Sequence, residues 1–324
     1  MSATAPDVET GAAARQPARL RIGRGEAHDG GRHRYPRFER RQRRAGYLLC
    51  APAVAHMVAF TLLPVLAALW LSFTDYRVLA PPSWVGIDNY VAMFSDQAFV
   101  KSIWNTSVYT FFTVPFAMLL SLLIAVALNE KIRARAWFRA AFFLPHVTAT
   151  VAVAMVWIWM YNPRIGLFNA ALGAIGISRI NWLGDPNWSM PSVILMGIWQ
   201  GIGVKMLIYL AALQGIPEHL YEAASIDGAS KRQQFFHITI PMLKYATFFV
   251  FVISLIDSFQ VFDSIWVMTQ GGPVNSTTVM TYEVYRSAFQ SFRMGYASAQ
   301  AVLLFAIIFV LTVVSKRLTR SEDV

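Results

Sequence analysis

The sequence carries little charge for its length. Asp, Glu, Lys and Arg together make up 14% of its 324 residues, whereas 56% of the residues are hydrophobic. Soluble domains usually contain about 25% charged residues, because a folded chain needs a charged surface to stay in solution. The shortage of charge argues against an ordinary soluble enzyme and predicts a polytopic membrane protein.

Residues that form disulfides, metal sites or phosphate sites are also scarce. A single cysteine, Cys50, excludes an internal disulfide framework. The six histidines are scattered, and no group of Cys and His has the spacing of a metal site. No glycine-rich Walker loop is present to hold the phosphates of ATP. We therefore expect no catalytic residue, no metal site and no cofactor site in this chain.

Positive charge is concentrated at the N-terminus. Residues 1–44 contain eleven Arg, no Lys and five acidic residues, a net charge of +6 out of +10 for the whole chain. A basic arm can bind nucleic acid. A basic segment directly before a long apolar helix is more typical of an N-terminus held in the cytoplasm. We predict a cytoplasmic arm, largely disordered because it has few large apolar residues, and no nucleic-acid partner.

Long apolar segments follow the arm. A bilayer core about 30 Å thick requires about 20 apolar residues in a helix. Six segments meet this length, at residues 46–73, 106–128, 138–160, 191–213, 243–267 and 295–315. We therefore predict an all-α membrane protein with six transmembrane helices within residues 45–317 and a short cytoplasmic tail at 318–324.

The loops between these segments differ in positive charge. Three regions are rich in Lys and Arg: Lys131, Arg133, Arg135 and Arg139 before the third segment, Lys231, Arg232 and Lys244 before the fifth, and Lys316, Arg317 and Arg320 after the sixth. The three alternate loops carry fewer. Because positive loops remain inside, both termini are predicted to face the cytoplasm.

One of the positive loops, residues 218–241, has the features of two short helices. Pro217 suits the first turn of a helix, and Gly228 can end that helix in the left-handed conformation. Ser230 can cap the next helix, and Pro241 marks the entry to the fifth membrane segment. This pattern is compatible with an amphipathic hairpin on the membrane surface or with a docking surface for another protein.

The same loop resembles the EAA loop of ABC importer permeases. The matching residues, with the spacing of that motif, are Glu222, Ala223, Ala224, Gly228, Ile238 and Pro241. Other segments resemble the carbohydrate branch of that family, namely residues 84–90, 216–217, 220–221, 226–229, 262–263, 268–273 and 295–297. The resemblance covers residues 45–317. It implies the type I permease fold of ABC importers, in a maltose and glycerol-phosphate type of system.

The resemblance also implies roles and partners. Glu222 would make a charged contact with a cytoplasmic ATPase, Ala223 and Ala224 would allow close packing, and Gly228 would form the turn. Asp227, Ile238 and Pro241 belong to the same coupling segment. The implied partners are a second, different permease chain, two ABC ATPase subunits that bind ATP and Mg, and an extracytoplasmic solute-binding protein, all at a bacterial cell membrane. The chain itself would not be an enzyme.

Charged and polar residues at membrane depth are the candidates for a solute path. Ionisable groups there are costly and usually functional. At 100° per residue, Ser254, Asp257 and Ser258 share one side of the fifth helix with Gln260 and Ser264, whereas Asp263 lies opposite Ser254. This stripe predicts a cavity wall, the alternative being a polar contact between helices. The resemblance implies a solute path along the middle of the fourth and fifth helices. Together with the stripe, it gives these candidate path residues: Trp199, Gln200, Gly201, Lys205, Ser254, Asp257 and Ser258.

We therefore expect the permease subunit of an ATP-driven importer for a mono- or oligosaccharide. The alternatives are a permease for glycerol phosphate or another polar solute, and an ion-coupled secondary transporter, which would not need the EAA loop. A membrane enzyme would need a cluster of catalytic or metal-binding side chains. His56 and His146 have no partner at such a spacing.

Overall fold

The computed structural model describes residues 36–130 and 133–320, with side chains for 45–130 and 133–317. It divides into two units, Met1–Val58 and Ala59–Val324. The first unit contributes helix α1 (Pro36–Met57). The predicted disorder of the arm falls on residues 1–35, which lie outside the described residues, and the same holds for the end of the tail.

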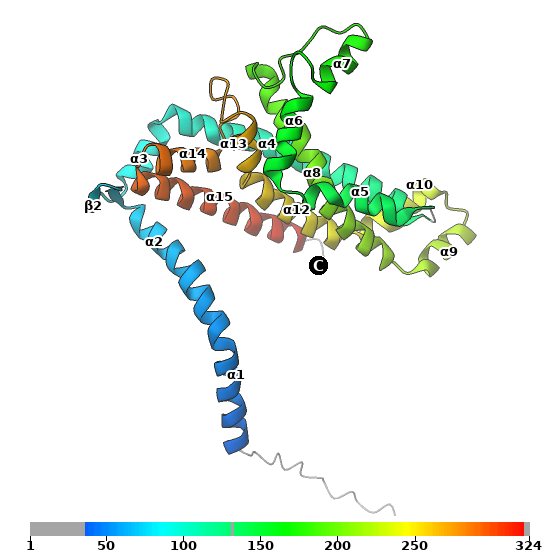
Figure 1. The fold of residues 1–324 in the computed structure, drawn as a ribbon. Coiled ribbons are helices and arrows are strands. Elements are labelled where there is room, and N and C mark those ends of the chain that lie inside the picture. The colour runs from blue at the N-terminus through cyan, green and yellow to red at the C-terminus, as the bar shows by residue number, and fades with distance from the viewer. Residues whose placement is uncertain (1–35, 131–132, 321–324) are drawn as a thin grey trace, which may run out of the picture. The chain divides into compact units, whose positions relative to one another are not determined.

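Long helices dominate the second unit (Figure 1). They are α4 (Gln97–Asn129), α8 (Pro186–Gln214), α12 (Lys244–Phe259) and α15 (Met294–Arg320). Helix α4 packs against both α8 and α12, and α15 packs against α12 and against α2 (Leu63–Leu71), which follows a π-helical turn, η1 (Val58–Leu62). Five helices among the described residues are long and apolar enough to cross a membrane, and a bent pair adds a sixth. By length and apolar composition, the six predicted spans are confirmed.

The third predicted span is a broken helix, not the single helix expected over residues 138–160. Helices α5 (Arg135–Val147) and α6 (Thr150–Met160) are bent by 99°. Thr148 is extended, and both its backbone N–H (3.1 Å) and its hydroxyl (2.9 Å) donate to the carbonyl of Leu144. These bonds end α5, whereas the apolar composition continues through the break, so hydropathy alone does not detect it.

The fifth span is also interrupted. Helix α12 ends at Phe259, residues 260–262 are not helical, and α13 (Asp263–Met268) follows. The Thr281 hydroxyl donates to the carbonyl of Val261, one of the groups that the break frees. The placement of Asp263 opposite Ser254 assumed an unbroken helix and is wrong for that reason.

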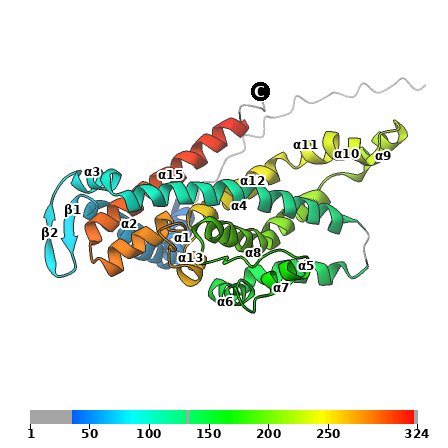
Figure 2. The same ribbon diagram turned by 90° about the horizontal axis from the view of Figure 1, so that it is seen from above.

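A strand hairpin and a short helix lie at the end of the second unit away from α9 (Glu218–Ile226), as Figures 1 and 2 show. Strands β1 (Thr74–Arg77) and β2 (Ala80–Trp84) form an antiparallel hairpin that the all-α prediction lacked. Helix α3 (Asp88–Ser95) follows the hairpin and begins within the matching segment 84–90. The remaining short helices are α7 (Leu167–Ala174), α14 (Met280–Tyr285) and the π-helical turn η3 (Arg286–Gln290).

Polar side chains attach these outer loops to the long helices. The Asn105 amide donates to the carbonyls of Asn275 and Thr278, each at 2.9 Å, and so holds the loop before α14 on helix α4. Glu283 is buried and pairs with Arg286 at 3.0 Å. Burial raises the pKa of Glu283, although the Arg286 guanidinium acts in the opposite direction. The Asn105 contacts therefore fix the loop before α14 on the bundle, and the Glu283–Arg286 pair is local to α14 and η3.

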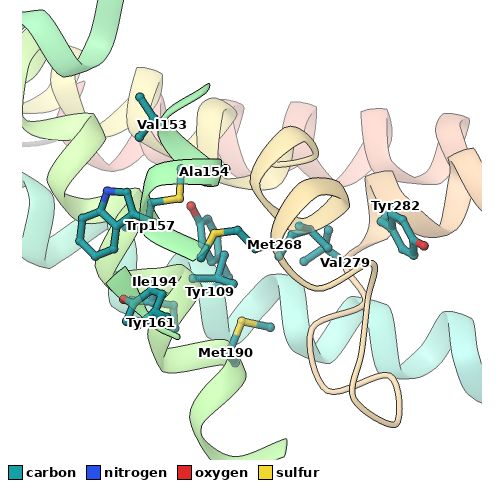
Figure 3. Close-up of a cluster of buried hydrophobic side chains, with 13 residues drawn as sticks. Tyr109, Val153, Ala154, Trp157, Tyr161, Met190, Ile194, Met268, Val279 and Tyr282 are labelled. Carbon is teal, nitrogen blue, oxygen red and sulfur yellow. The ribbon is translucent and has the colours of Figure 1, made fainter. Parts of the chain in front are cut away.

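Three clusters of buried hydrophobic side chains form the core. The first, shown in Figure 3, joins α4, α6, α8, α13 and α14 and contains Tyr109, Trp157 and Met190. The second joins the other end of α8 to α4 and α12, and the third lies among α3, α4, α12 and α15. Along α8 the first cluster ends at Met196 and the second begins at Ile202. The intervening turn is free to line a cavity.

Helix α8 approaches α5 closely at Gly203. A Cβ atom added there would lie 2.5 Å from the Phe142 carbonyl oxygen and 2.9 Å from Phe143 Cα. Both are backbone atoms, which cannot move aside as a flexible side chain can.

We predict that Gly203→Ala lowers stability by about 1–3 kcal/mol, the range for overpacking, measured as a lower thermal midpoint of the purified protein in detergent. Gly173→Ala is the matched control, because that glycine is helical and has open space around it. Equal midpoints for the two variants would contradict the close contact.

Candidate functional site

A cavity of about 250 Å³ lies where the two broken spans meet α4 and α8. Its walls come from four parts of the chain: Tyr109, Thr113, Val114 and Ala117 on α4; His146 and Thr150 beside the first break; Gly197, Gln200, Gly201 and Lys205 on α8; and Ser254, Asp257, Ser258 and residues 260–264 around the second break. Six of the seven predicted path residues are therefore brought together around one cavity.

Trp199 is the predicted path residue that does not line the cavity. Its ring centroid lies 5.5 Å from that of Trp157, and 41% of the residue is exposed. Trp157 belongs to the first hydrophobic cluster. Trp199 lies one position before Gln200, so its side chain points about 100° away from that of Gln200 around the helix. It therefore packs against the first hydrophobic cluster and not into the cavity.

Lys205 places its amine in the cavity wall by folding back along its own helix. Its Nζ donates to the carbonyl of Gly201 at 3.1 Å, and the residue is 8% exposed. A Cβ added to Gly201 would lie 3.0 Å from this nitrogen. Glycine at position 201 thus leaves the space in which the lysine amine rests.

Asp257 faces the same cavity from α12. Among the described residues no ion pair joins it to Lys205, although both line one space. Both charges thus line the same cavity, as their choice as path candidates predicts. Asp263, at the first position of α13, adds a second carboxylate to the wall because the break after Phe259 turns it inward.

Two hydroxyls in the wall are buried without a partner. Ser254 is 2% exposed and Thr113 is 8% exposed, and in the described structure the Oγ of Ser254 and the Oγ1 of Thr113 have no hydrogen-bond partner. An unsatisfied buried hydroxyl is unfavourable unless water or a ligand reaches it. These hydroxyls therefore suit a space that holds a hydrogen-bonding molecule.

The wall also contains residues that the sequence did not single out. The Gln200 amide donates to Thr150 Oγ1 at 3.1 Å, and this bond ties α8 to the start of α6. Tyr109 packs directly against Gly197, where any Cβ would overlap its hydroxyl. His146 and Thr150 enter the wall only because the third span is broken. In the sequence, Pro145 and Thr148 are the residues that could have indicated this break.

The coupling segment predicted at residues 218–241 lies at one end of the second unit. It consists of α9, α10 (Lys231–Gln234), the π-helical turn η2 (Phe235–Thr239) and α11 (Ile240–Met242). Gly228 has a φ of +79°, as predicted for the end of the first helix. Ser230 forms a capping box with Gln233, also as predicted. Pro217 is the residue before α9, one position earlier than expected.

Side-chain contacts hold the two helices of this segment together. Tyr221 and Thr239 share a hydrogen bond of 2.9 Å between their hydroxyls, and the Gln234 amide donates to the Ser225 hydroxyl at 2.9 Å. The predicted coupling residues divide by exposure: Glu222, Ala223, Asp227, Gly228 and Pro241 are exposed, whereas Ala224 and Ile238 are half-buried. The segment is thus a braced hairpin with an uncovered outer face.

Chemically, the cavity offers hydroxyl, amide, amine and carboxylate groups beside a similar extent of apolar surface. Such a set can exchange hydrogen bonds with a polyhydroxylated molecule. Within the described ranges, no group of three His, Cys, Asp or Glu side chains could hold a metal ion.

Comparison with known proteins gives consistent matches. Residues 90–322 match the family described as "Binding-protein-dependent transport system inner membrane component". The chain is 34% identical over 284 residues to the trehalose/maltose transport system permease protein MalF of Thermococcus litoralis, covering 86% of this chain and 95% of that protein. It is also 34% identical over 287 residues to the sn-glycerol-3-phosphate transport system permease protein UgpA of Escherichia coli O157:H7, covering 87% and 96%.

A solved structure with the same fold is a bacterial ABC transporter involved in the import of the acidic polysaccharide alginate. The superposition has a TM-score of 0.78 at 26% identity and covers 88% of this chain and 99% of the matched chain. A second structure shows the alginate transporter in complex with an alginate pentasaccharide-bound periplasmic protein, with the same TM-score and identity.

The shared cavity makes the interaction of Lys205 with Asp257 testable. Lys205 is buried, whereas Asp257 is exposed to the cavity. Removing one charge leaves the other without its partner, whereas removing both charges leaves none unpaired. We predict that Lys205→Met lowers the thermal midpoint more than Lys205→Met combined with Asp257→Asn does, with a coupling of about 0.5–3 kcal/mol.

The control is a double-mutant cycle in which Lys101→Met takes the place of Lys205→Met, because Lys101 is exposed on α4 outside the cavity. Additive effects of Lys205 and Asp257 would show that the two charges do not interact.

Proposed function

Because the chain belongs to the family of inner membrane components of binding-protein-dependent transport systems, we propose that it is the permease subunit of an ATP-driven importer whose cavity forms part of the membrane path for a sugar. The observation that carries this proposal is the cavity with its polar lining groups, which four spans line, two of them at their breaks. Interrupted helices at membrane depth occur where they line a substrate site.

The sugar is supported by the lining and by the relatives. Hydroxyl, amide and carboxylate groups in the wall suit the hydroxyl groups of a carbohydrate. The names of the relatives include a trehalose/maltose permease and a glycerol-3-phosphate permease, and the solved relative imports alginate. Glycerol phosphate or another polar solute is the second candidate, and it has the same relatives in its favour.

We further propose that α9 docks on a partner ATPase. No residue of α9 is buried, and at its end Ile226 is 86% exposed. A large apolar side chain beside exposed small residues and a carboxylate is typical of an interface that a partner covers. ATP and Mg are then bound by two partner ATPase subunits. A second permease chain and a solute-binding protein complete the system.

The proposed orientation places the α9 end in the cytoplasm, with both termini on that side. In the amide orientation that satisfies its neighbours, Gln214 accepts hydrogen bonds from Arg135 (2.8 Å) and Arg139 (3.1 Å), which brings these positive side chains to the α9 end of α8. Positive residues at this end agree with the rule for cytoplasmic loops. An ion-coupled transporter has no ATPase subunit to bind, so it would not need a braced, uncovered hairpin at the α9 end.

The function is tested by uptake into sealed vesicles that contain the complete transporter and its binding protein. ATP-dependent accumulation of a carbohydrate that requires the ATPase subunit supports the proposal. Accumulation driven by an ion gradient without ATPase would contradict it.

The docking is tested by Glu222→Lys, which reverses an exposed charge on α9 without touching the core. We expect unchanged membrane insertion and at least about a tenfold loss of co-purified ATPase, because a complementary contact becomes repulsive. Glu130→Lys, an exposed charge reversal at the end of α4 and off α9, is the control. Wild-type recovery of ATPase with Glu222→Lys would refute the docking role.

A further inference from the structure

The ionisable groups in the cavity wall are unequal in sign. Lys205 contributes one positive charge, Asp257 and Asp263 contribute two negative charges, and His146 is neutral at the formal count for pH 7. We propose that this net negative wall selects an uncharged sugar and excludes acidic and phosphorylated ones. The inference rests on the proposed function and specifies the substrate class of the same cavity.

The wall is a built site and not a chance group of acids. Ser254 is 2% exposed, lines the cavity together with the two carboxylates, and in the described structure its Oγ has no hydrogen-bond partner. Thr113 presents a second such hydroxyl from α4. Both are neutral groups that can donate to or accept from a sugar hydroxyl. Water or a hydrogen-bonding solute would satisfy them, and neither has to be charged.

The one positive group is already engaged. The Lys205 amine donates to the Gly201 carbonyl, and Gly201 leaves the space for that position. An anionic solute would have to draw this amine away while two carboxylates repelled it. A hydroxylated, uncharged solute instead donates hydrogen bonds to Asp257 and Asp263, and such bonds to ionised groups are stronger than neutral ones.

The charge of the path can be measured without knowing the solute. The only native cysteine is Cys50, so Cys50→Ser gives a background in which Gln260→Cys places one thiol in the cavity wall. The probes are a cationic and an anionic methanethiosulfonate reagent of similar size, applied at pH 8 to the complete transporter in proteoliposomes. The reference is Ser83→Cys on the exposed hairpin, where Asp75 and Arg77 cancel each other's charge.

We expect the ratio of cationic to anionic modification rates to be about tenfold higher at position 260 than at position 83, because a charged cleft concentrates ions of opposite sign. Adding Asp257→Asn and Asp263→Asn should remove the excess. A ratio at position 260 equal to or below the reference overturns the inference, whatever the solute is.

Uptake gives the second readout. Asp257→Asn should reduce ATP-dependent uptake at least about tenfold, because a sugar hydroxyl loses its charged acceptor. Asp88→Asn, which changes an exposed carboxylate outside the cavity, is the control and should keep wild-type uptake. ATP-dependent uptake restricted to uronate or phosphorylated sugars would overturn the inference and leave the proposed function standing. Absence of ATP-dependent sugar uptake with the rate excess intact would overturn the proposed function alone.

Discussion

A polypeptide backbone inside a bilayer has no water to satisfy its N–H and C=O groups, so a membrane helix can stop only where protein or an aqueous cavity replaces those bonds. Two spans of this chain stop in that way, at residues 148–149 and 260–262. Both interruptions border the same cavity. The freed Val261 carbonyl accepts from Thr281, and the Thr148 hydroxyl returns to the last turn of α5. The cavity and the broken helices are therefore two aspects of one arrangement.

The number of spans and the local structure of the coupling segment could be predicted from the sequence. The length of the apolar segments determines the number of spans, because a helix must cross about 30 Å of hydrocarbon. Local backbone chemistry decides the second. Gly228 adopts the left-handed conformation that side chains disfavour, and Ser230 satisfies the free amide groups of a helix start. Signals of this kind act within a few residues and do not depend on the rest of the fold.

The breaks and half of the cavity wall could not be predicted in this way. Hydropathy measures how apolar a segment is and not its direction, so residues 138–160 read as one helix. The periodicity that grouped Ser254, Asp257 and Ser258 holds on α12, but it fails for Asp263 beyond Phe259, where the helix is interrupted. The small hairpin was missed because prolines in β2 are poor strand formers.

Close contacts at two glycines of α8, one with a backbone and one with a side chain, limit how its neighbours can move against it. Gly203 meets the backbone of α5, and Gly197 meets Tyr109 of α4, so α4, α5 and α8 have no room to slide past one another and should travel as one rigid block. Asp257 lies on α12, between the interruptions at Leu243 and at residues 260–262, whereas Lys205 lies on α8. A movement of α12 relative to α8 would therefore change the distance between the two charges.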